Sequence, residues 1–170
     1  LPDGIIEVFS AVNAMGQGIA TTLAQLVVDV FEVPMDRVRV VLGDTDRGDG
    51  FGSAGSRSLS TGGSALREGA EKTLDEARRP AAQALEASPE DVEYRGGRFL
   101  VRGTDLAIDL AQVAQKQPQQ RIFLESTTKV AGPSWPNGCH ICEVEIDPYT
   151  GTTQVVAYSR VNDVGRVVNP

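Results

Sequence analysis

One stretch rich in glycine and serine has the residue types best suited to binding an anionic ligand. Residues 50–58 read GFGSAGSRS and contain the string G-x-G-x-x-G. Glycines let a backbone approach a ligand closely, while hydroxyls and a guanidinium can donate hydrogen bonds. A helix is predicted directly after the stretch, so its free N–H groups would favour phosphate or another oxyanion. The candidate binding residues are Ser53, Ala54, Gly55, Ser56, Arg57 and Ser58.

A second glycine turn offers a similar arrangement. Gly16, Gln17 and Gly18 precede another predicted helix, and the Gln17 amide can both donate to and accept from a ligand. Two glycine-rich helix starts in one small chain favour one large anionic ligand shared between them. The alternative is a plain loop, with Arg57 paired to a neighbouring carboxylate.

Several familiar motifs do not fit these residues. A Rossmann loop places its first glycine at the end of a strand and an acidic residue at the end of the next strand, about 20 residues later. Here the preceding strand ends near Gly43, and the acidic residues at the right distance fall in the predicted helix. No Lys-Ser or Lys-Thr pair follows the glycines, as a Walker loop requires. The residues two before Ser53 and Ser56 are not glycines, and the chain has one histidine, which disfavours a serine nucleophile.

The two cysteines, Cys139 and Cys142, form the sequence C-H-I-C. Polar and apolar residues alternate around them, which predicts a strand in which residues three apart face opposite ways. A zinc site also needs a second Cys/His pair, which the chain lacks. We therefore interpret both cysteines as structural and His140 as a hydrogen-bonded residue on a half-buried strand.

Composition limits the class of protein further. The chain has 170 residues, 41% of them hydrophobic, and a net charge of −7. That is enough for a packed core, whereas an acidic surface repels nucleic acid and anionic membranes. Apolar runs are too short to span a bilayer, and the N-terminus lacks a signal-peptide pattern, so we expect a cytoplasmic protein without nucleic-acid or membrane partners.

Hydrophobic periodicity predicts an α+β fold, with mixed strand-helix units followed by β-hairpins. Strand-helix units occupy residues 1–88, and residues 89–170 are rich in hairpins. The predicted strands are 5–10, 38–42, 92–94, 98–101, 139–146 and 153–161. The predicted helices are 19–31, 63–78 and a short helix that Thr104 opens as N-cap and that carries Leu106, Leu110 and Val113. Pro80 either breaks the second helix or starts a further helical turn through Leu85.

Motifs along nearly the whole chain carry a family resemblance. They are AMGQG at 14–18 with Thr21, Thr22 and Gln25, VLGDTD at 41–46, GSAGSRS at 52–58, GGSA at 62–65, EVEID at 143–147, TG at 150–151, DVG at 163–165 and NP at 169–170. In this order they resemble elements of the molybdenum-binding large subunit of the xanthine dehydrogenase and aldehyde oxidase family, including its carbon monoxide dehydrogenase branch. The informative part of the first stretch is then 52–58, and Gly50 lies outside it.

The resemblance implies a cofactor and roles for individual residues. Gln17 matches the family glutamine that hydrogen-bonds molybdopterin, with Gly16 and Gly18 beside it. The loop from Ser53 to Ser58 matches the segment that holds the pterin and its phosphate. Sulfurs of the cofactor ligate the molybdenum, so no metal ligands are expected from this chain. The cytosine dinucleotide form is expected, with iron–sulfur clusters and FAD on other domains or subunits.

Departures from the family pattern imply a fragment. In the family, the catalytic glutamate in G-x-G-E lies downstream of the asparagine-proline element, and the G-G-G-F-G-G and R-G-x-G loops lie on upstream segments; none of these segments is matched in this sequence. We therefore expect an internal piece of a molybdenum hydroxylase large subunit, inactive alone, whose partners are the rest of that subunit and iron–sulfur and flavin units. The alternative is a stand-alone, non-catalytic module that binds a nucleotide or a protein. A reading frame that ends near Pro170 would favour the alternative.

Overall fold

The computed structural model describes residues 1–130, 132 and 134–169, and it divides into two compact units, Leu1–Ala131 and Gly132–Pro170. The division at residue 88 expected from the sequence falls inside the first unit. The reason is that the apolar residues of the hairpin after residue 88 share a core cluster with the preceding long helix. Each unit is described by itself.

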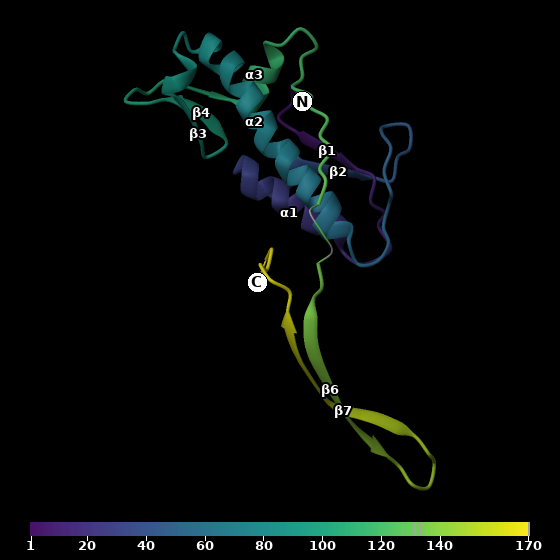
Figure 1. Cartoon of the computed structure of the whole chain (residues 1–170). Helices are drawn as coiled ribbons and strands as arrows, with labels where there is room; N and C mark the ends of the chain where they lie inside the picture. The colour runs from purple at the N-terminus through teal and green to yellow at the C-terminus, as the bar shows by residue number, and fades with distance from the viewer. Residues whose placement is uncertain (131, 133, 170) are drawn as a thin grey trace. The chain divides into compact units, whose positions relative to one another are not determined.

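The first unit begins with a strand-helix-strand arrangement (Figure 1). Strands β1, Ile6–Ser10, and β2, Val38–Leu42, pair in parallel, and helix α1, Ile19–Phe31, connects them. The apolar face of α1 is buried, and Leu23 and Val27 have no exposed surface. All three elements are confirmed where the sequence predicted them, because their apolar residues recur with the period of a helix or strand.

A long helix packs across α1. A π-helical turn, η2, spans Ser58–Gly63 and leads into α2, Ser64–Ala84. Its buried residues are all alanines: Ala70, Ala77, Ala81 and Ala82. Of the two alternatives at Pro80, the break is wrong and the continued helical structure as far as Leu85 is confirmed, since one helix runs through Pro80 to a cap at Leu85. Proline removes one helical hydrogen bond, and the buried alanines on either side of it keep this part of the helix packed in the core.

A three-stranded antiparallel sheet follows. It contains β3, Val92–Arg95, β4, Arg98–Val101, and β5, Ala107–Asp109, in that order. The first hairpin is confirmed, and its turn contacts the end of α1, where the Gly96 amide donates to Glu32 Oε2 at 2.5 Å. The short 3-10 turns η1, Met35–Arg37, and η3, Pro89–Asp91, precede β2 and β3.

The short third helix starts later than predicted. Helix α3 spans Leu110–Gln115, and its N-cap is Asp109, which forms a capping box with Gln112. Thr104 as N-cap is therefore wrong. Its hydroxyl donates instead to the Val101 carbonyl and accepts from the Leu106 amide, which makes a turn before β5. A threonine can satisfy backbone groups in a turn as well as at a helix start, so its position alone did not distinguish the two.

The second unit is a long antiparallel hairpin. Strands β6, Asn137–Ile146, and β7, Thr153–Asp163, pair with a bulge near Glu143 and Val144, which confirms the predicted hairpin. Every residue of both strands is exposed within the chain. Cys139 and Cys142 are free and exposed. His140 is exposed rather than half-buried, and its ring contacts Tyr158 Oη at 2.9 Å and Asn162 Oδ1 at 3.1 Å.

None of the helices within the described ranges is long and apolar enough to cross a bilayer.

Candidate functional site

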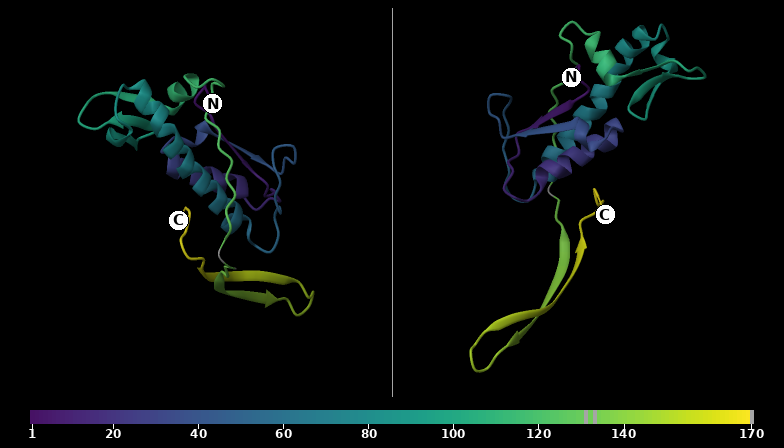
Figure 2. Two further views of the ribbon diagram at one scale, coloured as in Figure 1. Left: turned by 45° about the horizontal axis from the view of Figure 1, so that its top comes forward. Right: turned by 180° about the vertical axis from the view of Figure 1, so that it is seen from behind.

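Both glycine-rich segments leave the same edge of the β1–β2 sheet. Because β1 and β2 are parallel, their carboxyl ends meet at Ser10 and Leu42, where the Gly43 amide donates to the Ser10 carbonyl at 3.1 Å. Residues 11–18 then lead to α1, and residues 43–57 lead to η2 and α2, as the further views in Figure 2 show. Ligands of strand-helix folds commonly bind at this edge.

Asn13 joins the two segments. Its backbone N–H donates to Ser53 Oγ at 2.8 Å, and its backbone carbonyl accepts from Ser53 Oγ at 3.1 Å. Ser58 Oγ in turn donates to Ser53 Oγ at 2.8 Å. The carbonyl of Asn13 also accepts from Gln17 Nε2 at 2.9 Å. Of the predicted site residues, Gln17 and Ser53, and Ser58 through Ser53, are therefore brought together around one residue that the sequence did not single out.

Gln17 fixes the shape of its own turn. Its Oε1 accepts from the Met15 amide at 2.6 Å, while its Nε2 donates to the Asn13 carbonyl. Gly16 and Gly18 flank it at φ values of 86° and 74°, a left-handed conformation that favours glycine. An amide nitrogen carries two hydrogens, so one N–H of the exposed Gln17 side chain is left for a ligand.

The tip of the second segment faces solvent. Ala54, Gly55, Ser56 and Arg57 are exposed, whereas Ser53 and Ser58 are half-buried. Ser56 has a φ of 56°, which is uncommon for a residue other than glycine. The Arg57 guanidinium lies 3.8 Å from the centre of the Phe51 ring, and no ion pair between Arg57 and a carboxylate occurs among the described residues. The tip therefore offers one hydroxyl and one cation to the outside.

The π-helical turn η2 follows this tip. The Arg57 carbonyl accepts from the Thr61 amide at 2.8 Å, and also from the hydroxyls of Ser60 and Thr61. Such turns are rare and are frequently found at functional sites. A Cβ on Gly62 would lie 2.7 Å from a Val12 methyl, so the turn packs directly on the segment after β1. The starts of α1 and of η2 thus lie close to the joined loops, and both carry positive helix-dipole ends.

Two other glycines are needed for this close approach. A Cβ on Gly43 would lie 2.8 Å from Asn13 Oδ1, and one on Gly50 would lie 2.2 Å from the Ala11 Cβ. Gly50 therefore has a packing role, since no side chain fits there, and this role is separate from the ligand-binding motif that the sequence places at 52–58. The sequence pattern contained Gly50, but nothing in it indicated that Ala11 was the neighbour.

Charged residues attach the loop after β2 to the sheet. Arg47 contacts Glu7 Oε1 at 2.6 Å and Asp44 Oδ2 at 3.2 Å, and Arg39 contacts Glu7 Oε2 at 2.7 Å. The hydrogen bond from Arg47, together with the charge of Arg39, lowers the pKa of the Glu7 carboxyl below its ordinary value of 4.5. These contacts hold the stem of the loop whose far end carries Ser53.

We expect Glu7→Gln to lower the free energy of unfolding at pH 7 by less than about 1 kcal/mol, as is typical of surface ion pairs. Because the folded-state pKa lies below the unfolded value of 4.5, this stabilisation is complete above that pH and is lost as the pH falls through the folded-state pKa. Urea unfolding between pH 3 and 7 measures it. The variant should show a shallower loss of stability at acid pH, whereas Glu93→Gln, an exposed residue on β3, should follow the parent.

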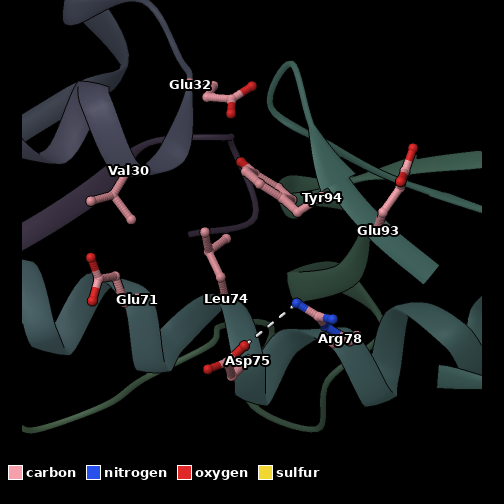
Figure 3. Close-up of a pocket in the computed structure, with 8 residues that line it drawn as sticks. All are labelled: Val30, Glu32, Glu71, Leu74, Asp75, Arg78, Glu93 and Tyr94. Atoms are coloured by element: carbon pink, nitrogen blue, oxygen red, sulfur yellow. Dashed lines mark hydrogen bonds and ion pairs between the residues drawn. The ribbon is translucent and has the colours of Figure 1, made fainter. Parts of the chain in front are cut away.

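The structure also has an open pocket away from these loops. Figure 3 shows it between α1, α2 and β3, lined by Val30, Glu32, Glu71, Leu74, Asp75, Arg78, Glu93 and Tyr94. Arg78 and Asp75 form an ion pair at 3.5 Å, and Tyr94 Oη donates to the Phe31 carbonyl at 2.7 Å. Burial raises the pKa of Tyr94. None of the residues predicted to bind a ligand lines this pocket.

No group of three or more His, Cys, Asp or Glu side chains in the described part of the chain is placed to hold a metal ion. The donors near the joined loops are instead amides, hydroxyls and helix N–H groups, together with Arg57. Donors of this kind are chemically suited to an organic anion.

The chain matches one family model along its whole length. The model describes a molybdopterin cofactor-binding domain and covers residues 1–170. Among curated proteins, the chain is 32% identical to the 6-hydroxypseudooxynicotine dehydrogenase complex subunit gamma of Paenarthrobacter nicotinovorans, covering 98% of this chain and 22% of the relative. It is 34% identical to the carbon monoxide dehydrogenase large chain of Hydrogenophaga pseudoflava, over 91% of this chain and 20% of that one.

Solved structures agree with this match. A Cu,Mo-CO dehydrogenase in its carbon monoxide reduced state superposes with a TM-score of 0.79 at 29% identity, over 100% of this chain and 22% of that one. Quinoline 2-oxidoreductase from Pseudomonas putida 86 gives a TM-score of 0.75 at 32% identity, over 100% and 23%. The chain thus spans about a fifth of the length of its relatives. It belongs to the molybdopterin cofactor-binding domain family of the xanthine dehydrogenase and carbon monoxide dehydrogenase large subunits.

Proposed function

We propose that the two joined loops, 13–18 and 53–58, hold the molybdopterin cofactor of a molybdenum hydroxylase. The observation that carries the proposal is their convergence on Asn13 beside the starts of two helices. In the complete subunit this chain would act as part of an oxidoreductase that inserts a water-derived oxygen into its substrate. The isolated chain would be inactive, since the proposed site contains no proton-transfer group.

The residues present fit such a group. A pterin with a phosphate tail needs hydrogen-bond donors for its anionic oxygens and mixed donors and acceptors for its ring edge. The free N–H of Gln17, the Ser56 hydroxyl, Arg57 and the helix starts are donors on the outer side of the loops. A Cβ placed on Gly16, Gly18 or Gly55 would meet no other atom within 4 Å, so this side is open to a ligand.

When bound, the cofactor supplies the molybdenum at which oxygen transfer takes place, and this chain supplies its binding and orientation. Gln17 fixes the shape of the 13–18 loop through its hydrogen bonds to the backbone of Asn13 and Met15, and it presents its second N–H to the ligand. The exposed tip 54–57 presents donors that are already in position before the ligand arrives. Preorganised donors of this kind cost little reorganisation on binding.

Finer features of the proposal come from the family resemblance. The cytosine dinucleotide form of the cofactor would suit two anion-binding loops, one for each end of a long ligand. Electrons would leave through iron–sulfur and flavin units, and the rest of the large subunit would supply the substrate pocket. The relatives named above are a subunit of a dehydrogenase complex and a large chain, which accords with partner subunits.

We expect Gln17→Ala in the full-length protein to lower bound molybdenum and organic cofactor together, about tenfold or more when the cofactor is limiting. The side chain makes two loop hydrogen bonds, each worth about 1 kcal/mol, and would lose its contact to the ligand as well. Metal analysis and quantification of the released pterin measure the effect. Gln83→Ala, an exposed glutamine on α2, is the matched control. Unchanged occupancy in Gln17→Ala would refute the assignment.

A further inference from the structure

The hydroxyl of Ser53 is fully used inside the protein. It accepts from the Asn13 amide at 2.8 Å and from Ser58 Oγ at 2.8 Å, and it donates to the Asn13 carbonyl at 3.1 Å. A serine hydroxyl has one hydrogen and two acceptor lone pairs, and these three contacts occupy all of them. If Ser53 instead donates to Ser58 Oγ, its hydrogen is still bound by a protein atom. In either direction Ser53 has no hydrogen left for an anion.

Ser56 is the opposite case. It is exposed, it adopts a left-handed backbone at a φ of 56°, and its hydroxyl has no hydrogen bond to another described residue. A left-handed conformation at a residue other than glycine is strained and is often kept at binding sites. Ser56 faces solvent, whereas Ser53 and Ser58 are half-buried. The three serines of the loop therefore have different chemical capacities, although the sequence gives them the same residue type.

We propose that Ser53 is a positioning residue that joins the two loops, and that Ser56 is the serine hydroxyl of this loop that donates to the anionic part of the ligand. The inference rests on the proposed function for the identity of the ligand, but the joining role of Ser53 does not require a ligand. Removing the Ser53 hydroxyl breaks the hydrogen bonds between the two loops whether or not cofactor is present. Removing Ser56 leaves the loops in place and deletes one contact.

The test uses the full-length protein in cofactor-free and cofactor-loaded forms, with Ser53→Ala and Ser56→Ala compared. Hydrogen exchange mass spectrometry over residues 11–18 measures the joined loops. In the cofactor-free protein, Ser53→Ala should speed exchange of the Asn13 amide about fivefold or more, because that amide loses its acceptor, whereas Ser56→Ala should leave it unchanged. Ser53→Thr keeps the hydroxyl and should restore slow exchange. If the alanine variant does not fold, Ser53→Cys replaces it, with the same expected direction.

Cofactor retention separates the two serines. After dialysis, Ser56→Ala should retain several times less cofactor than the parent, with parental exchange in the cofactor-free form. Ser53→Ala should retain less cofactor and should also show faster exchange in the cofactor-free form. Cofactor loss in Ser53→Ala without faster exchange would overturn the inference, because Ser53 would then be a direct ligand. If neither variant changes retention while Ser53→Ala still speeds exchange, the joining role stands, and the Ser56 assignment and the cofactor role of this loop both fail.

Discussion

Gly50→Ala is expected to lower the free energy of unfolding by about 2 kcal/mol and to reduce bound cofactor in the full-length protein. The added methyl would lie 2.2 Å from the Ala11 Cβ, and the nearest alternative atom is the Ala11 Cα at 3.7 Å. A Cβ has no rotamer by which to move aside, so the backbone of one segment must shift. Forced repacking of this kind typically costs about 1 to 3 kcal/mol.

The shift caused by Gly50→Ala would reach the proposed site directly. Ala11 is two residues before Asn13, and Gly50 is three before Ser53, so moving them apart pulls on both ends of the hydrogen-bonded link. Urea unfolding and metal analysis measure the two effects. Gly132→Ala is the control, because a Cβ there meets no atom within 4 Å and the backbone is not left-handed. A Gly50→Ala protein with parental stability and parental cofactor content would show that the close approach of Gly50 to Ala11 is not required for either property.

Phe99→Ala is expected to have the largest effect on stability, about 4 kcal/mol. Phe99 has no exposed surface, and its ring packs edge-to-face on Tyr94 with centroids 4.8 Å apart. It belongs to a core cluster with Val92, Ile108 and Val113, which is separate from the cluster of Val12, Ile19 and Leu23 beneath the joined loops. Under conditions where the variant remains folded, its cofactor content should therefore stay close to that of the parent.

The comparison of these two variants distinguishes damage to the fold from damage to the site. Phe99→Ala should lose more stability and less cofactor than Gly50→Ala. Phe123→Ala is the control for the aromatic truncation, since Phe123 is 68% exposed and should change stability by less than about 0.5 kcal/mol. A Phe99→Ala protein that loses cofactor in proportion to its loss of stability would mean that the two clusters are not independent.

The sequence predicted the strand-helix elements well because their periodicity is strong. The strands at β1 and β2, helix α1 and both hairpins were found where the pattern placed them. The incorrect predictions lie at residues whose type is compatible with more than one local structure. Pro80 does not end α2, since packing of the neighbouring alanines keeps the helix intact, and Thr104 makes a turn while Asp109 caps α3. The three-residue strand β5 is too short to show a period.

The candidate site was predicted from residue types, and its internal organisation could not be. Gln17 and residues 53–58 were singled out because glycines, hydroxyls and helix starts favour an anionic ligand. The joining role of Asn13 depends mainly on backbone atoms, which every residue has, and so leaves no signal in the sequence. The steric need for Gly50 depends on a contact across 39 residues of sequence, with Ala11. The different capacities of Ser53 and Ser56 follow from hydrogen bonds that only the fold establishes.

The most direct measurement is an experimental structure of the full-length protein with its cofactor bound. We expect the pterin or its phosphate tail within hydrogen-bonding distance of the Gln17 side chain and of residues 54–57, with the link between Asn13 and Ser53 unchanged. A cofactor bound without contact to either loop would contradict the central proposal.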